Sequence, residues 1–230
     1  MFFSSLAFAA GVRAGVEASE VERLTDIVRG LPQNGKEIRV ATLPATVAIG
    51  RSAPDFKRRS DTALARRWGM SRPRVEAETD WLASCAQGAC RDARVAPWMK
   101  AVAVIRAVPR ENRPALVQTL LSRRIGYVSD RAVDDHWANP LATLHHRAGD
   151  CEDHALLKRA MLMAAGYSDA EVPLLVLETV KGQGHMVLLV ARADHMLVLD
   201  NRFRAPVPLG ALGRDRVVAV ASGAGYFAAR

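Results

Sequence analysis

The amino-acid sequence predicts an α+β protein in which helices come first and a small antiparallel sheet follows. Residues 98–108 and 113–125 look helical, as does the short stretch 81–83 before them. A helix expected over residues 151–165 should pack on the sheet. The C-terminal third instead holds short apolar runs of strand length, at residues 172–177, 186–190 and 196–199.

The N-terminal part is predicted to be mostly helical, with one segment that shows no regular pattern. Residues 11–30 place apolar side chains in helical phase. The segment that follows, residues 31–75, is interrupted by prolines that we expect to break regular structure, namely Pro44, Pro54 and Pro73. We therefore expect a poorly readable region at residues 11–75 and one folded domain at residues 76–230.

The first ten residues resemble the end of a secretory signal sequence, with Ala7-Phe8-Ala9 as the cleavage site. The segment is short and lacks basic residues, so a truncated signal peptide and a plain apolar N-terminus both fit it. No run of 18 or more apolar residues occurs, so we expect no membrane span.

The net charge of +8 is placed unevenly along the 230 residues. Residues 1–130 hold 21 Lys and Arg against 13 Asp and Glu, and the remainder is balanced. Such an excess suits an acidic partner, a membrane surface or nucleic acid. No nucleic-acid-binding motif accompanies it, so we expect a solvated arginine-rich surface and no nucleic-acid partner.

The segment Gly149-Asp150-Cys151-Glu152-Asp153-His154 carries the strongest chemical signal. It places Cys151 in the first turn of the predicted helix, where the helix dipole favours the thiolate and lowers the thiol pKa. Asp150 at the N-cap and Asp153 at the third helical position also fit plain helix capping. A lone cysteine is, by itself, more often a small buried residue than a nucleophile.

Two residues of the predicted hairpin complete a catalytic arrangement. If residues 193–194 form its loop, Val187 lies opposite Asp200, so His185 and Asp200 share one face of the sheet. Cys151 would then attack a carbonyl carbon, His185 would move the proton, and Asp200 would orient the imidazole. Together these residues predict a cysteine hydrolase.

The other two cysteines, Cys85 and Cys90, are five residues apart. In an oxidising compartment they would close a short disulfide loop, whereas in a cytosol they would stay free thiols. Their spacing, without further Cys or His residues nearby, does not predict a zinc site. Pairing them leaves Cys151 unpaired.

Four segments resemble the bacterial transglutaminase-like cysteine proteinases, which include the LapG-type periplasmic proteases that release surface adhesins. The match covers roughly residues 80–205 and rests on residues 135–140, 149–155, 184–188 and 197–201. The resemblance implies a papain-like, transglutaminase-like core within residues 76–230, with Cys151, His185 and Asp200 as the triad. His154 stands where many members have tyrosine, a position outside the triad.

The resemblance also implies a calcium ion beside the nucleophile, with Asp150 and Glu152 as matching ligands and Asp153 as a weaker one. Calcium takes carboxylate and backbone oxygens, which such a loop offers. A periplasmic location, an adhesin-like surface protein as substrate and an inner-membrane regulatory receptor are implied as well.

Three functions remain open from the sequence. The leading one is a cysteine endopeptidase that acts through a thioester acyl-enzyme. A transglutaminase or deamidase would use the same three residues with a different acceptor or substrate group. A binding module that docks an acidic protein or a membrane through the basic N-terminal half is the non-enzymatic alternative.

Overall fold

The computed structural model describes residues 56–90, 92–130, 136–192 and 195–229. The possible signal peptide at residues 1–10, the helix expected at residues 11–30 and the hairpin loop at residues 193–194 lie outside these ranges. Among the described residues no helix is both long and apolar enough to cross a membrane.

The described chain is an α+β structure, as predicted, with five α-helices and an antiparallel sheet. The helices are α2 (Ala63–Ser84), α3 (Ala96–Ala107), α4 (Arg113–Arg124), α5 (Pro140–His146) and α6 (Cys151–Ala164). Single 3₁₀ turns cover Ala93–Val95, Arg110–Asn112, Asp169–Glu171 and Leu209–Leu212, and a π-helical turn covers Cys85–Ala89.

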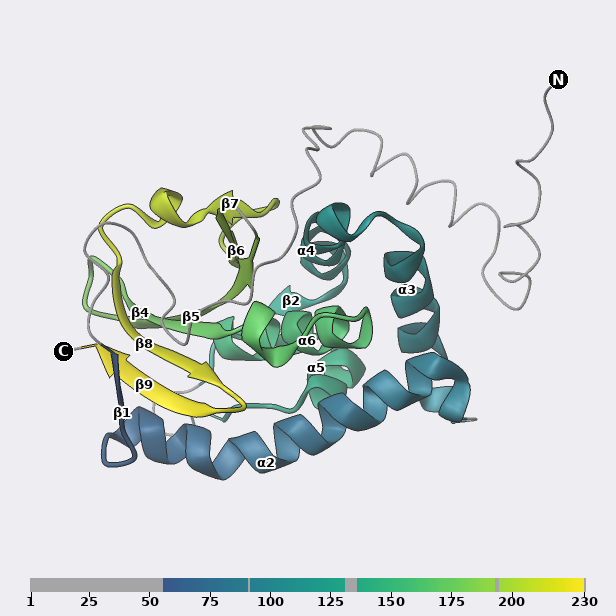
Figure 1. The fold of residues 1–230 in the computed structure, drawn as a ribbon, viewed down its shortest axis with the longest axis horizontal. Coiled ribbons are helices and arrows are strands. Elements are labelled where there is room, and N and C mark those ends of the chain that lie inside the picture. Colours follow the sequence, from purple (N-terminus) through teal and green to yellow (C-terminus); the bar gives the residue numbers. More distant parts are fainter. Residues whose placement is uncertain (1–55, 91, 131–135, 193–194, 230) are drawn as a thin grey trace, which may run out of the picture.

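The main sheet has seven strands in the order β1-β9-β8-β4-β5-β6-β7, with every neighbouring pair antiparallel. The strands are β1 (Phe56–Arg58), β4 (Leu174–Glu178), β5 (Gly184–Ala191), β6 (Met196–Leu199), β7 (Val207–Pro208), β8 (Arg216–Ser222) and β9 (Gly225–Ala229). A separate parallel pair joins β2 (Gly126–Tyr127) to β3 (Ala148–Gly149). Helices α3, α4, α5 and α6 lie to one side of the sheet, and α2 runs along the molecule from beside β1 and β9 to α3 (Figure 1).

The three predicted strands are confirmed as β4, β5 and β6, and they form consecutive parts of this sheet. Strands β8 and β9 were not foreseen. They extend the sheet beyond β4. Strand β8 holds valines, which favour strands, whereas β9 is mostly glycine and alanine, which have low strand propensity. The strand form of β9 therefore depends on its pairing with β8 and β1.

Helix α2 contradicts the expectation that Pro73 breaks regular structure. Pro73 lies inside this 22-residue helix, on its exposed side, where water can bond the carbonyl that proline leaves unpaired. Trp68, Val75 and Leu82 recur every seven residues on the opposite side and are at most 1% exposed. Their burial outweighs the cost of the proline. The division expected between residues 75 and 76 falls within α2.

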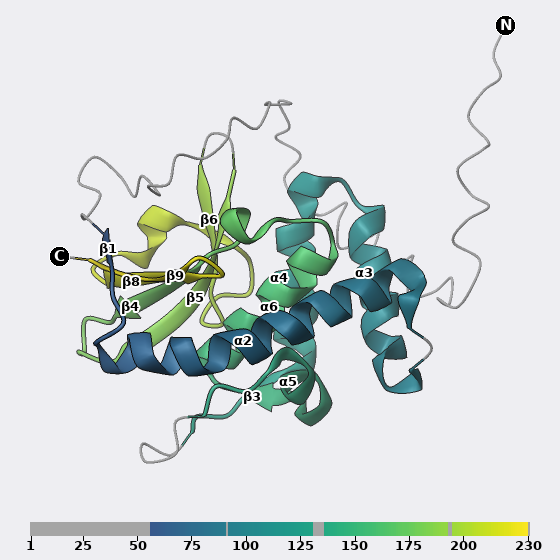
Figure 2. The same cartoon turned by 60° about the horizontal axis from the view of Figure 1, so that its bottom comes forward.

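Helix α6 is the centre of the fold, with twelve of its fourteen residues buried. It packs against β5 on one side and against α2, α4 and α5 on the others (Figures 1 and 2). Its C-terminal carbonyls are capped by three arginines: Arg106 bonds Ala164 O, Arg113 bonds Ala165 O and Arg110 bonds Gly166 O. Part of the basic excess thus stabilises the negative end of a helix.

Cys85 and Cys90 form a disulfide in the structure, which closes the turn between α2 and α3. Of the two states left open by the sequence, the oxidised one is therefore present. Cys151 is the free cysteine, as the pairing required.

Candidate active site

Gly149 fixes the approach of the chain to helix α6. A Cβ atom added at this position would lie 2.6 Å from the Cβ and 2.7 Å from Oδ2 of Asp153. Both distances are well below van der Waals contact, so the backbone and the first turn of α6 come this close only because residue 149 is glycine. Cys151, the first residue of the helix, is thereby set at a tight strand-to-helix junction.

Asp153 caps this junction, as the sequence predicted. Its Oδ1 accepts a hydrogen bond from Ala138 N at 2.8 Å, and its Oδ2 accepts one from Asp150 N at 3.4 Å. Burial raises the pKa of the Asp153 carboxyl to about 6. The bond to Ala138 also explains part of the 135–140 motif, since it ties that segment to helix α6.

Asn139, in the same motif, and Leu141, just after it, are anchored to helix α2. The Glu78 carboxylate accepts from Asn139 Nδ2 at 3.2 Å and from Leu141 N at 2.5 Å. Asn139 is also the N-cap of α5. The motif therefore has a structural role, because it connects helix α6 to helix α2. Its partner on α2, Glu78, was not predicted from the sequence.

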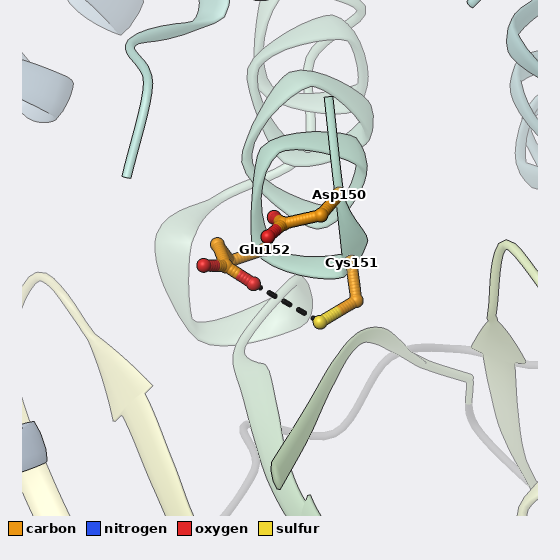
Figure 3. A group of neighbouring side chains, drawn as sticks. All are labelled: Asp150, Cys151 and Glu152. Carbon is orange, nitrogen blue, oxygen red and sulfur yellow. Dashed lines mark hydrogen bonds between the residues drawn. The ribbon is translucent and has the colours of Figure 1, made fainter. Parts of the chain in front are cut away.

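Cys151 lies half-buried beside two carboxylates, and its thiol donates a hydrogen bond to Glu152 Oε2 at 3.0 Å (Figure 3). Burial raises the pKa of this thiol, and the charge and hydrogen bond of Glu152 raise it further. This is the opposite of the lowering expected from the helix dipole. The backbone N–H of Met186, directly after His185, acts in the other direction and lowers the thiol pKa.

His185 and Asp200 meet as the hairpin register required. In the pairing of β5 with β6, Leu188 lies opposite Leu199, which is the predicted register, and Arg192 N bonds His195 O at 3.0 Å. The His185 Nε2 to Asp200 Oδ1 distance is 3.0 Å. The His185 side chain is 9% exposed and that of Asp200 is fully buried.

Asp200 stays ionised in spite of its burial. Burial alone would raise the pKa of this carboxyl, but hydrogen bonds from His185 and Arg202 outweigh it and lower the pKa to about 2. Nε2 of His185 therefore faces an ionised acceptor and carries the proton. Nδ1 is then the nitrogen left to accept a proton from another group.

Two further residues hold the backbone around Asp200, and neither was singled out from the sequence. Gln118 Nε2 donates to Asp200 O at 2.7 Å and to Phe203 O at 2.5 Å. Lys158, two turns after Cys151 on α6, is 1% exposed and donates to Leu199 O at 3.4 Å; burial lowers its pKa to about 7. Gln118 could have been noticed in the sequence, because it is a polar residue on the otherwise apolar face of the helix predicted at residues 113–125.

The residues expected to bind calcium separate into two groups. Ligand atoms of Asp150, Cys151 and Glu152 lie within 4.8 Å of one another, whereas the oxygens of Asp153 are used in capping (Figure 3). Asp150 Oδ1 is buried without a hydrogen-bond partner. Burial, together with the charge of Asp150, raises the pKa of Glu152 to about 7. A pair of buried carboxylates with an orphaned oxygen fits a hard cation such as calcium.

The fold is similar to solved structures of LapG from Legionella pneumophila. The EGTA-treated form gives a TM-score of 0.55 at 22% identity, over 66% of this chain and 86% of that one. The calcium-bound form gives 0.54 at 22% identity, over 65% and 87%. No curated protein matches the sequence.

Residues 79–207 match the family described as bacterial transglutaminase-like cysteine proteinases. The matched segment includes the turn from Gly149 to Asp153, His185 on β5, and Asp200. This segment is more than half of the chain and contains the whole arrangement described above. The chain belongs to the bacterial transglutaminase-like cysteine proteinase family.

Proposed function

We propose that the chain is a cysteine endopeptidase in which Cys151 is the nucleophile, His185 the general base and Asp200 the residue that orients His185. The observation that carries the proposal is the buried His185–Asp200 hydrogen bond through Nε2. It leaves Nδ1 as the nitrogen that can take a proton, near the start of β5, the strand on which the helix of Cys151 packs.

The reaction follows the usual order for a Cys–His pair. Nδ1 of His185 takes the thiol proton, and the sulfur attacks the carbonyl carbon of the scissile peptide bond. The Cys151 N–H, at the start of α6 and without an acceptor inside the helix, would be one donor to the oxyanion. His185 then protonates the leaving amine, and water hydrolyses the thioester with His185 again as the base.

Calcium is proposed at Asp150 and Glu152, with Asp153 left to its capping role. The bound ion would supply positive charge that compensates the two carboxylates beside the thiol. The same fold in Legionella LapG has been seen in a calcium-bound form, which supports the proposal. We expect calcium to raise the melting temperature in wild type and to have no effect in the isosteric Asp150→Asn/Glu152→Gln variant, with magnesium as the control ion. Equal melting temperatures of wild type in calcium and in EGTA would contradict the site.

We propose a periplasmic location and a surface protein of the adhesin type as substrate, under an inner-membrane regulatory receptor. The family resemblance supports all three. The Cys85–Cys90 disulfide supports the location, because such bonds persist in oxidising compartments.

The test uses a surface-protein fraction of the bacterium that encodes the chain, incubated with wild type, Cys151→Ala or His185→Ala. New N-termini that appear with wild type alone, identified by mass spectrometry, are the expected result. Cleavage that persists in either variant would refute the assignment. The same spectra separate hydrolysis from the transglutaminase and deamidase alternatives, since those leave the backbone intact and change side-chain mass.

A further inference from the structure

The buried carboxylate of Asp200 is held mostly by one residue, Arg202. Its Oδ1 accepts from His185 Nε2 at 3.0 Å and from Arg202 N at 2.8 Å. Its Oδ2 accepts from Arg202 Nε at 2.8 Å and Nη2 at 2.7 Å. Arg202 thus supplies three of the four bonds, and two of them come from the adjacent Nε and Nη2 of its planar guanidinium fork, which converge on Oδ2.

The far side of the same guanidinium is also fixed. Arg202 Nη1 pairs with Asp215 Oδ2 at 2.8 Å, and Asp215 Oδ1 accepts from Val180 N at 3.3 Å. Val180 belongs to the turn between β4 and β5, five residues before His185. A continuous series of contacts therefore links this turn through Asp215, Arg202 and Asp200 to His185, which lies on the strand that follows the turn.

We propose that Arg202 is a positioning residue of the triad: it aims Oδ1 of Asp200 at His185 and keeps this buried carboxylate charged, while Asp215 holds the guanidinium in place. The proposal rests on the proposed peptidase function. It assigns no contact of Arg202 with the substrate.

The charges around Asp200 favour this role. His185 faces it from β5 and Lys158 from α6, and Lys158 bonds the neighbouring Leu199 carbonyl rather than the carboxylate. Gln118 from α4 is neutral and bonds the backbone of Asp200. Among the described residues, Arg202 is therefore the permanent cation in direct contact with the carboxylate, since arginine stays protonated at all relevant pH values.

The test compares Arg202→Gln and Arg202→Lys with Arg214→Gln. Arg214 lines the same surface pocket as Arg202, so Arg214→Gln is a matched control that removes one positive charge. We expect Arg202→Gln to lower kcat about tenfold to a hundredfold, the usual loss when an orienting partner is removed, with little change in KM. The acidic limb of its pH profile should move to higher pH, because Asp200 then protonates more easily. Arg202→Lys should keep the acidic limb of wild type and lose kcat, since an ammonium cannot form the fork.

A second readout does not depend on turnover. The Nε2–H of His185 bonded to Asp200 should give a downfield imidazole resonance in proton NMR, absent in His185→Ala. We expect this resonance to disappear or move upfield in Arg202→Gln and to persist in Arg214→Gln.

Either of two results overturns the proposal. One is an unchanged resonance in Arg202→Gln. The other is a kcat within twofold of wild type in both Arg202 variants, together with an acidic limb at the same pH as in wild type. If Arg202→Gln does not fold, Arg202→Lys decides by its kcat. If wild type shows no Cys151-dependent cleavage, the peptidase assignment fails, and the NMR comparison still decides the role of Arg202.

Discussion

Replacing Gly149 by alanine tests how tightly the strand-to-helix junction is built. The added Cβ would lie 2.6 Å from the Asp153 Cβ, whereas carbon atoms in contact are normally about 3.5–4.0 Å apart. One of the two segments must therefore move by about 1 Å. A shift of Asp153 by this amount would break its 2.8 Å bond with Ala138 N.

The expected loss combines two effects. Overpacking in a tight site costs about 1–3 kcal/mol, and loss of a helix cap costs about 1 kcal/mol. We therefore expect Gly149→Ala to lower the free energy of unfolding by about 2–4 kcal/mol, a large part of the ~5–15 kcal/mol typical of a domain.

Equilibrium urea unfolding measures the effect, with Gly184→Ala as the matched control. Gly184 also lies at a strand beside the site, but an added Cβ there meets nothing within 4 Å. Because the clash is with the Asp153 side chain, Asp153→Gly should relieve at least about 1 kcal/mol of it in a double-mutant cycle. Equal stability of Gly149→Ala and Gly184→Ala would refute the reasoning.

Two further predictions concern helix α6. Arg106→Ala removes bonds to Ala164 O and Ala86 O and should destabilise the protein by about 1.5–3 kcal/mol in urea unfolding, whereas Arg94→Ala, at an exposed ion pair, should be neutral. The Lys158 pKa of about 7 is below its unfolded value, so the unfolded chain binds more protons and stability rises with pH from about 7 to about 10. Lys158→Met should flatten that rise and stabilise the protein at pH 7 by about 1 kcal/mol or more; an unchanged pH dependence would refute the role of Lys158.

The parts of the fold that follow from local pattern were predictable. The helix after Cys151 and the β5–β6 register follow from apolar spacing and from the parity of one hairpin, so they could be read from residues close together in the sequence. Most of helix α2 was missed because burial of three residues seven apart outweighs a proline. Strand β8 was missed because its partner β4 is about forty residues earlier, and β9 joins the sheet only through β8 and β1.

The same division applies to the site. The order and spacing of Cys151, His185 and Asp200 predicted a triad, of which the structure brings His185 and Asp200 into hydrogen-bond contact. The capping role of Asp153 was predicted by its position. Arg202 carries no local signal of its role, and the polar Gln118 on an apolar helix face indicates only that it has a buried partner. Both roles depend on which atoms of Asp200 the side chains reach. The raised pKa of the Cys151 thiol also required the structure, because it comes from burial and from the direction of the Glu152 side chain.

An activated Cys151–His185 pair would show itself in the alkylation rate of Cys151 at pH 6, read by intact mass and peptide mapping in saturating calcium. An unassisted thiol with a pKa of ~8.5 is almost fully protonated at this pH and reacts slowly. We expect wild type to react at least tenfold faster than His185→Ala. Equal rates in the two proteins would make Cys151 a structural thiol and contradict the proposed mechanism.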